Sequence, residues 1–114
     1  MTTVVNVKVL YIRPKYKNLK EWMNDPNNIY IGRGKIVFID GERYPKEDSV
    51  WSNPYKLKDY DRTTCLELYK NYIIKKIDAG ELCLDDIRGK NLGCWCKEPN
   101  KKVSCHGDVL ISLL

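Results

Sequence analysis

The sequence predicts a small α/β domain in which a compact sheet of about four strands is covered by helices. Short apolar runs rich in β-branched residues alternate along the chain with one long segment of helical periodicity. The 114 residues, of which 43% are hydrophobic, are enough for one core but not for two domains. Because no repeat, low-complexity tract or Pro/Ser-rich linker divides the chain, we expect a single domain over residues 1–114.

Four segments have the composition of strands: residues 4–12, 29–31, 36–39 and 92–96. In the first segment, valines at alternate positions would lie on one face, which is typical of a half-buried strand. Asp40 and Gly41 follow the third segment and predict a hairpin turn. Residues 43–60 contain two prolines and are expected to be irregular.

One helix is predicted from its apolar periodicity. Apolar residues at three- or four-residue spacing would form one buried stripe, made of Leu66, Tyr69, Ile73 and Ile77. Asp61 or Thr64 can cap the start of this helix, and Gly80 can end it. Three shorter helices are expected, over residues 19–23, 82–87 and 107–114.

Charge and motifs exclude several classes of protein. The net charge is +5, and lysines supply 15 of the 20 cations without forming one cluster. This surplus supports solubility and weak contact with phosphate backbones, but the pI of 8.9 is below the guide value of about 9 for a dedicated nucleic-acid domain. No GxSxG or P-loop motif is present, so neither a serine hydrolase nor a P-loop enzyme is expected.

Composition also indicates a compartment. No apolar stretch approaches the ~20 residues of a membrane helix, and the first residues lack the pattern of a secretory signal. We therefore expect a cytoplasmic protein. The many Lys, Asn, Ile and Tyr residues suggest an AT-rich genome and a viral source, for which the compartment would be the host cytoplasm. Five cysteines in that compartment argue against a disulfide framework, and Cys65 and Cys83 are interpreted as buried small hydrophobic residues.

The cysteines and the histidine near the C-terminus have three interpretations. The first is a metal site, because Cys94, Cys96, Cys105 and His106 have the composition of a tetrahedral zinc site. Only one residue separates the first two cysteines, whereas zinc knuckles have two to four. In a strand such residues lie about 6.6 Å apart, but sulfurs on one zinc ion lie about 3.8 Å apart, so both can bind one ion only if the segment bends.

The second interpretation is a ligand-binding or catalytic site. Cys96 would stand near the carboxyl end of a strand, where open α/β sheets place ligands. Cys105 and His106 would begin the last helix, where free amides attract phosphate or carboxylate, with the thiol as nucleophile and the imidazole as base or orienting donor. In the third interpretation, Cys94 and Cys96 fill the core from one strand face, and the later pair only caps a helix.

Two loops offer further ligand contacts. In the first, Arg33 lies between Gly32 and Gly34, directly after a predicted strand. Glycines let a backbone approach a ligand closely, and the planar fork of arginine binds phosphate or carboxylate. The GxGxxG spacing of a dinucleotide site is absent, and an ordinary turn is the alternative interpretation.

The second loop is the Trp-Ser-Asn-Pro-Tyr stretch at residues 51–55. Trp51 and Tyr55 could stack on a base, and Asn53 could bind the edge of that base or hold the turn at the following proline. Arg62, at the start of the predicted long helix, could reach the same side of the molecule. The alternatives are a purely structural loop and a solvated charge.

In combination, these segments resemble the DUF4326 family of small proteins from bacteria, phages and large DNA viruses. The resemblance extends over nearly the whole chain and is carried by Val5-Asn6-Val7, Tyr30-Ile31-Gly32-Arg33, Trp51-Ser52-Asn53-Pro54-Tyr55, Tyr69, Gly89-Lys90, Leu92-Gly93-Cys94-Trp95-Cys96 and Cys105-His106-Gly107-Asp108-Val109-Leu110. Tyr55 stands where the family usually has phenylalanine, and the spacer over residues 97–104 is longer and more polar than usual. The resemblance implies a domain of unknown function and brings no established activity, but it does imply that these motifs belong together.

The main hypothesis is a protein that binds, and can process, a nucleotide-like or other phosphorylated small ligand. Arg33 and the helix amides would hold phosphate, and Trp51 or Tyr55 would stack. Asn53 would orient polar edges of the ligand, and a Cys105 thiolate or His106 would carry out any chemistry. The alternative is a zinc-stabilised binding module. A third hypothesis is a basic nucleic-acid accessory protein whose binding weakens steeply with salt. No membrane partner is expected, and the sequence leaves enzymatic activity, cofactor and oligomeric state open.

Overall fold

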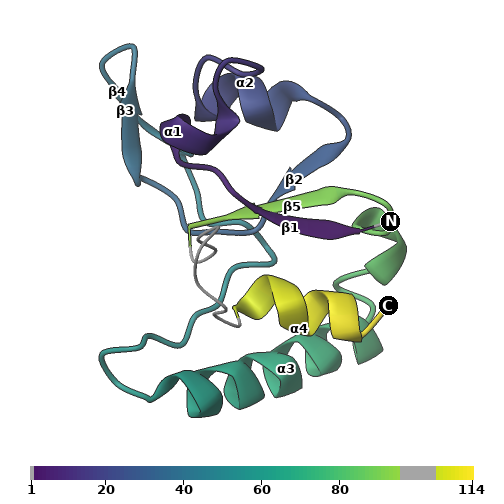
Figure 1. The fold of residues 1–114 in the computed structure, drawn as a ribbon. Helices are drawn as coiled ribbons and strands as arrows, with labels where there is room; N and C mark the ends of the chain where they lie inside the picture. Colours follow the sequence, from purple (N-terminus) through teal and green to yellow (C-terminus); the bar gives the residue numbers. More distant parts are fainter. Residues whose placement is uncertain (1, 96–104) are drawn as a thin grey trace.

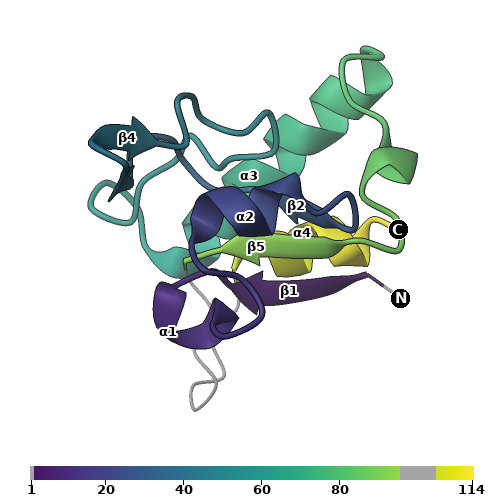
Figure 2. The same ribbon diagram turned by 90° about the horizontal axis from the view of Figure 1, so that it is seen from above.

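A three-stranded parallel sheet lies at the centre of the molecule, between two layers of helices (Figures 1 and 2). The computed structural model describes residues 2–95 and 105–114. The strands β1 (Thr3–Asn6), β5 (Asn91–Cys94) and β2 (Asn28–Tyr30) lie in the order β1-β5-β2, so the last strand in the sequence is the central one. Crossover connections with helices join these parallel strands, and the predicted α/β class is confirmed.

Helices cover both faces of this sheet (Figure 1). On one face lie α1 (Val9–Ile12) and α2 (Leu19–Asn24), and on the other lie α3 (Arg62–Asp78) and α4 (His106–Ser112). A 3₁₀ turn, η1 (Leu84–Asp86), precedes β5. Within residues 2–95 and 105–114, no helix is long and apolar enough to cross a membrane.

Each face of the sheet has its own core cluster. The cluster on the α3 and α4 side contains the buried residues Ile31, Trp51, Tyr69, Ile73, Ile87, Leu92, Cys94, Cys105 and Leu110. The cluster on the α1 and α2 side contains Val7, Ile12, Leu19, Trp22 and Tyr30. Gly93 in the central strand leaves room for this second cluster, because a Cβ at that position would collide with the Trp22 ring and with Val7.

A separate hairpin stands beside the sheet, formed by β3 (Val37–Ile39) and β4 (Glu42–Tyr44). Asp40 and Gly41 have φ values of 54° and 82°, as the central residues of a type I′ turn require, so the predicted hairpin turn is confirmed. The expected sheet of about four strands is instead divided into a three-stranded and a two-stranded sheet. The second hairpin strand lies in a stretch whose charged residues did not predict a strand.

The first strand is shorter than predicted. β1 ends at Asn6, whose side-chain Oδ1 accepts a hydrogen bond of 2.9 Å from the backbone N–H of Lys8. This local bond turns the chain out of the sheet and into α1. Val7 is fully buried, but Val9 is 39% exposed, so the alternation of valines does not correspond to one continuous strand face.

The long helix α3 confirms the periodicity argument. Asp61 caps it by accepting a 2.7 Å hydrogen bond from the backbone N–H of Thr64, and this interaction lowers the pKa of the Asp61 carboxyl. Its most buried residues are Cys65, Tyr69 and Ile73. The buried face of the helix is therefore rotated slightly from the predicted one, with Cys65 in the place of Leu66. Cys65 is buried as predicted, whereas the prediction for Cys83 is wrong, because that residue is exposed ahead of η1.

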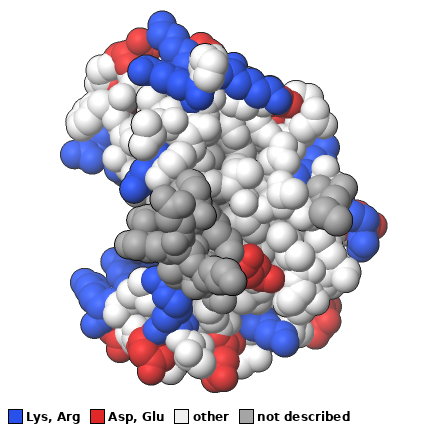
Figure 3. Space-filling view, in the orientation of Figure 1, with Lys and Arg blue, Asp and Glu red and all other residues white. Residues whose placement is uncertain are grey.

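Charged side chains are mixed on the face shown in Figure 3. Lys and Arg gather along the upper edge of this face and again at its lower left, and Asp and Glu lie beside them in both places. The net charge of +5 is therefore not collected into one basic area on this face.

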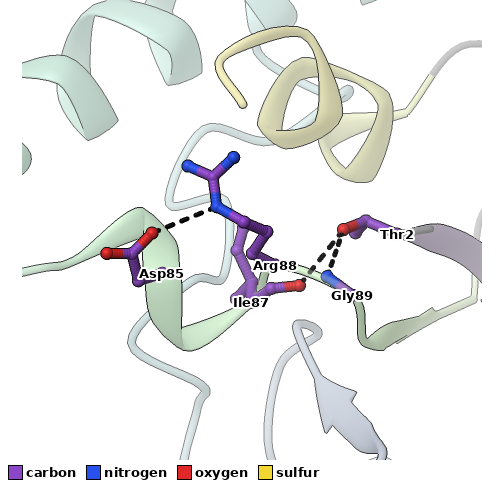
Figure 4. Close-up of polar contacts among 5 residues, drawn as sticks. All are labelled: Thr2, Asp85, Ile87, Arg88 and Gly89. Atoms are coloured by element: carbon purple, nitrogen blue, oxygen red, sulfur yellow. Dashed lines mark hydrogen bonds and ion pairs between the residues drawn. The ribbon is translucent and has the colours of Figure 1, made fainter.

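The start of β1 is tied to the turn that precedes β5 (Figure 4). The Thr2 hydroxyl accepts a 2.7 Å hydrogen bond from the Gly89 N–H and donates a 3.4 Å bond to the Ile87 carbonyl. Nearby, Arg88 Nε lies 3.0 Å from Asp85 Oδ1, but both side chains are more than half exposed, so this ion pair adds little stability. The Thr2 contacts help to fix the register of β1 against β5.

Side-chain hydrogen bonds continue across the whole sheet in a line that we call the asparagine ladder. The Thr3 hydroxyl donates to Asn91 Oδ1 (2.8 Å), and Asn91 Nδ2 donates to Asn28 Oδ1 (2.9 Å). Asn28 Nδ2 then donates to the Trp22 carbonyl in α2 (3.0 Å). Asn28 and Asn91 also line a cavity of about 560 Å³ between β1, α1 and α2, which we call the second cavity.

Candidate functional site

A cavity of about 460 Å³ opens where β2 and β5 end, and we call it the site pocket. Its lining comes from distant stretches of the chain: Gly32, Arg33, Ile36, Asn53, Tyr55, Leu57, Arg62, Cys65, Leu66, Cys94, Trp95, Cys105 and His106. Figure 1 shows that α3 and α4 both begin on the side where β5 ends. The pocket therefore occupies the carboxyl edge of the parallel sheet, where open α/β folds place their ligands.

The structure brings together most of the residues that the sequence singled out. Those that line the site pocket are Arg33, Asn53, Tyr55, Arg62, Cys94, Cys105 and His106. Gly34 and Trp51 lie outside this lining, and Cys96 lies outside the described residues. The two arginines carry the formal charge of the lining, which contains no Asp or Glu among the residues described. Its potential therefore favours an anion.

Arg33 is held in place by the loop that faces it. One guanidinium nitrogen, Nη2, donates to the carbonyls of Asn53 (3.0 Å) and Tyr55 (3.3 Å). The structure gives Nε and Nη1 no hydrogen-bond partner among the residues it describes, so these donors stay available to an anion. The Asn53 side chain accepts a 2.9 Å bond from the Tyr55 N–H, which is the turn-holding role considered for it, and the base-reading role stays a prediction.

Tyr30 supports this arrangement from the sheet, and the sequence analysis did not assign it a role. Its hydroxyl accepts a 2.7 Å hydrogen bond from Trp95 Nε1 and donates a 2.6 Å bond to the Arg33 carbonyl. The ring passes so close to Gly32 that a Cβ there would lie 2.5 Å from the hydroxyl oxygen. Gly32, two residues after Tyr30 in the sequence, was the signal that could have predicted this contact.

His106 has one ring nitrogen bonded and one free. Its Nε2 lies 2.7 Å from the Ile31 carbonyl, and because a carbonyl can only accept, Nε2 carries the proton. Burial lowers the pKa of His106, and the hydrogen bond to Ile31 opposes this effect only in part, so the ring is neutral at pH 7. The lone pair is then on Nδ1, which makes no hydrogen bond within the described residues.

The free nitrogen of His106 faces solvent space. Every fully buried side-chain nitrogen or oxygen in the described residues has a hydrogen-bond partner. An unbonded Nδ1 on a side chain that is only 7% exposed must therefore keep contact with solvent, and His106 belongs to the lining of the site pocket. The Tyr69 ring fixes the imidazole from the other side, edge to face at 5.3 Å.

Cys94 and Cys105 meet in the wall of the pocket, where their Sγ atoms lie 3.7 Å apart. Cys105 caps α4, and Asp108 completes a capping box by accepting a 2.9 Å bond from the Cys105 N–H. Asp108 thus occupies the first turn of α4, a helix of seven residues. The predicted binding of phosphate by the amides of this helix is not supported, and the two arginines remain as candidate anion-binding groups.

Two predicted ligand contacts have packing roles instead. Trp51 is only 4% exposed and belongs to the core, and its carbonyl accepts a 2.5 Å bond from the Tyr69 hydroxyl. It is therefore not placed to stack on a ligand, unlike Tyr55. The Gly34 N–H donates to Asp48 Oδ1 (2.7 Å), and a Cβ there would lie 2.5 Å from the Glu47 backbone, so this glycine lets two backbone segments pack closely.

The predicted metal site would use the same cysteines. The separation of Cys94 and Cys105 is near the value of about 3.8 Å for two sulfurs on one zinc ion. His106 Nε2 already bonds a carbonyl, so only Nδ1 could serve as a ligand. Among the described residues no group of three Cys, His, Asp or Glu side chains could hold a metal, and Cys96 lies outside them. The zinc site stays a prediction.

Comparisons with known proteins agree on one family. The model of DUF4326, a domain of unknown function, matches residues 15–114. An uncharacterised protein of Acanthamoeba polyphaga mimivirus, R718, is 36% identical over 93 residues, or 75% of this chain and 65% of the relative. An uncharacterised 12.4 kDa protein from the nrdA-td intergenic region of Enterobacteria phage T4 is 37% identical over 70 residues, or 58% of this chain and 60% of the relative. The chain thus matches less than two thirds of the length of each relative, both relatives are viral, and no solved structure matches.

Proposed function

The chain belongs to the DUF4326 family, and on that premise we propose that its site pocket binds, and can process, a nucleotide-like or other phosphorylated small ligand. One observation carries the proposal: two arginines and a neutral histidine with a free Nδ1 converge at the carboxyl edge of a parallel sheet. The volume of about 460 Å³ lies within the range of small-molecule sites.

The lining suggests which residues of the pocket bind each part of such a ligand. Arg33 offers unbonded donors for a phosphate, and Arg62, the first residue of α3, adds charge at the end of the helix where the peptide dipoles are also positive. Tyr55, Leu57 and Trp95 provide the apolar and aromatic wall that a planar base needs. An anion joined to a planar ring satisfies both halves of the pocket.

His106 is the group that supports chemistry in addition to binding. Its neutral ring presents Nδ1 as a hydrogen-bond acceptor, and such an atom can take a proton from a ligand hydroxyl or from a water molecule beside a phosphate. Cys105, the other predicted catalytic residue, is 1% exposed and its thiol contacts Cys94. We therefore assign the role of base to His106 ahead of a nucleophilic role for Cys105.

The experiment is a thermal-shift and calorimetric titration with inorganic phosphate, pyrophosphate, AMP, GMP and ATP. At least one nucleotide should raise the Tm, and Arg33→Lys should weaken its affinity about tenfold, because lysine keeps the charge but loses the planar fork. Arg13→Ala is the matched control, because Arg13 lines the second cavity and its loss should leave the affinity unchanged. No stabilisation by any member of the panel, or equal binding by Arg33→Lys, would reject the proposal.

The zinc-stabilised binding module is the second candidate, and the sulfur separation of 3.7 Å favours it. Elemental analysis of purified protein tests it directly. One equivalent of zinc, lost together with the fold in Cys105→Ser, is the expected result. Metal-free folded protein would eliminate this candidate.

We propose that the protein acts in the cytoplasm of an infected cell, and the viral origin of both relatives supports the infected cell as its setting. A nucleic-acid accessory role has less support, since acidic side chains lie beside the basic ones on the face of Figure 3. Binding to DNA or RNA that falls steeply with salt would restore that role, and flat salt dependence would dismiss it.

A further inference from the structure

The contact between Cys94 and Cys105 joins two separate elements of the fold. Cys94 is the last residue of the central strand, and Cys105 is the N-cap of α4. Their Sγ atoms lie 3.7 Å apart, neither cysteine is part of a disulfide, and both residues line the site pocket. The two residues are 0% and 1% exposed, so they lie in the wall of the pocket, and a reagent reaches their sulfurs only when that wall opens locally.

The other described cysteines show what is particular to this pair. Cys65 is also buried and also lines the site pocket, but its Sγ contacts the Tyr60 carbonyl at 3.9 Å and not another thiol. Cys83 is exposed at the far end of α3, ahead of η1. In a compartment that keeps thiols reduced, a disulfide that does form is usually transient and catalytic or redox-sensing rather than structural.

We propose that Cys94 and Cys105 are a redox-active dithiol, which a low-molecular-weight disulfide such as oxidised glutathione converts to an intramolecular disulfide. One thiolate attacks a sulfur of the small disulfide, whose S–S bond breaks and releases the first thiol as its thiolate. The second cysteine thiolate then attacks the mixed disulfide and releases the second small thiol. The two cysteines lose two electrons and two protons, and the small disulfide gains both.

Oxidation would also change the shape of the site pocket. A disulfide has an S–S bond of about 2.05 Å, so the two sulfurs must approach each other from 3.7 Å, which rearranges side chains or backbone where β5 ends and α4 begins. His106 is the first residue of that helix and follows Cys105 directly. We expect the disulfide to shift the imidazole and to weaken ligand binding at least fivefold. This second part of the inference rests on the proposed function, whereas formation of the disulfide does not.

The experiment equilibrates the full chain, carrying Cys83→Ser to prevent links between molecules, with reduced and oxidised glutathione at several ratios. After acid quenching and alkylation, peptide mapping should identify a Cys94–Cys105 link and two alkylatable thiols fewer. Cys65→Ser is the matched control, because this residue is buried in the same lining, and its loss should leave the link unchanged. Cys96→Ser should also leave it unchanged. The mapping relies on the intact pair, so it does not depend on whether variants at Cys94 or Cys105 fold.

Three outcomes of the mapping experiment would overturn the dithiol. A link through Cys96, thiols that stay free at ratios that modify Cys65, or one equivalent of zinc held by both thiols would each contradict it. Titration of AMP into the reduced and the oxidised protein tests the second part. A disulfide that forms in a protein that binds no member of the nucleotide panel would reject the proposed function and leave the dithiol standing. Equal affinity in both redox states would reject only the coupling.

Discussion

The site pocket and the second cavity are each lined by two cations, Arg33 with Arg62 and Arg13 with Lys15. Neither has a carboxylate among its described lining residues, and the second cavity is the larger one, at about 560 Å³ against about 460 Å³. The difference is in their buried polar groups. The amides beside the second cavity are bonded to one another in the asparagine ladder, whereas His106 in the site pocket keeps Nδ1 unbonded.

This difference separates a polar group that holds the fold from one that is available for function. A hydrogen bond that is completed inside the protein stabilises the native state and leaves nothing for a ligand to replace. A ring nitrogen that is free in a largely buried side chain offers a ligand an acceptor without first breaking a protein contact. Charge and volume alone do not distinguish the two cavities, but the completeness of the hydrogen bonding does.

The largest expected effect comes from breaking the asparagine ladder. Asn28→Ala removes two hydrogen bonds in a buried position and leaves Asn91 Nδ2 without its partner, which should lower the free energy of unfolding by about 3 kcal/mol. The Trp22 carbonyl keeps only its 3.3 Å bond from the Asp25 N–H. Urea unfolding followed by circular dichroism measures this change. The exposed Asn24, replaced by alanine, is the control and should change stability by less than about 0.5 kcal/mol. A ladder variant as stable as that control would mean that the ladder is not structural.

Next in size is the loss of the hydroxyl that joins the sheet to the site pocket. Tyr30→Phe removes the partner of Trp95 Nε1 and of the Arg33 carbonyl, so we expect a loss of about 2 kcal/mol in stability. In contrast to the ladder variant, it should also weaken the affinity for AMP, because Arg33 loses a support. Tyr11→Phe, at a residue that is 41% exposed, is the control for both measurements. Full affinity for AMP in Tyr30→Phe would show that the hydroxyl does not position Arg33.

A smaller effect follows from the protonation of His106. Its folded-state pKa is lowered by burial below the unfolded value of about 6.5, so the unfolded chain takes up the proton first as the pH falls. The contribution to stability is complete above about pH 6.5 and is lost as the pH falls through the folded-state pKa, with a slope of at most about 1.4 kcal/mol per pH unit.

Urea unfolding between about pH 8 and about pH 5.5 measures this slope above the range where most carboxylates titrate. His106→Gln can still donate an N–H to the Ile31 carbonyl but does not titrate, so the slope should become flat. A slope that persists in this variant would assign the pH dependence to other groups. Because the sequence contains one histidine, the interpretation involves a single imidazole.

The smallest effect concerns the start of α3 at the edge of the site pocket. Asp61→Ala removes the side chain that caps the Thr64 N–H and should lower stability by about 1 kcal/mol. The exposed Asp59, replaced by alanine, is the matched control and should have little effect. Asp61→Ala could also strengthen AMP binding while it weakens the helix. That result would mean that the Asp61 carboxylate repels the anion and reduces the attraction that Arg62 provides.

Local signals in the sequence predicted local structure well. The helical spacing of Tyr69 and Ile73 and the Asp-Gly pair at residues 40–41 each indicate structure formed by neighbours in the chain. The sequence did not predict that the sheet is divided in two, because strand pairing depends on residues far apart. The valines at 7 and 9 misled for a similar reason, since the Asn6 side chain ends the strand before their alternation can take effect.

The candidate site was predictable in its membership but not in its bonding. Arg33, Asn53 and His106 have the side chains that a phosphate site needs, and the structure places them around one cavity. Their roles depend on partners that a sequence does not reveal, such as the Ile31 carbonyl that fixes the ring of His106. Trp51 shows the same limit, because an aromatic residue in a loop can serve either a ligand or the core, and only burial distinguishes them.

The position of β5 has a consequence for biosynthesis. Its residues, Asn91–Cys94, supply hydrogen-bond partners to both β1 and β2, which are made much earlier. Until residues 91–94 have been made, β1 and β2 lack the strand that lies between them in the finished sheet. The three-stranded sheet therefore cannot be completed while only its two N-terminal strands have been translated.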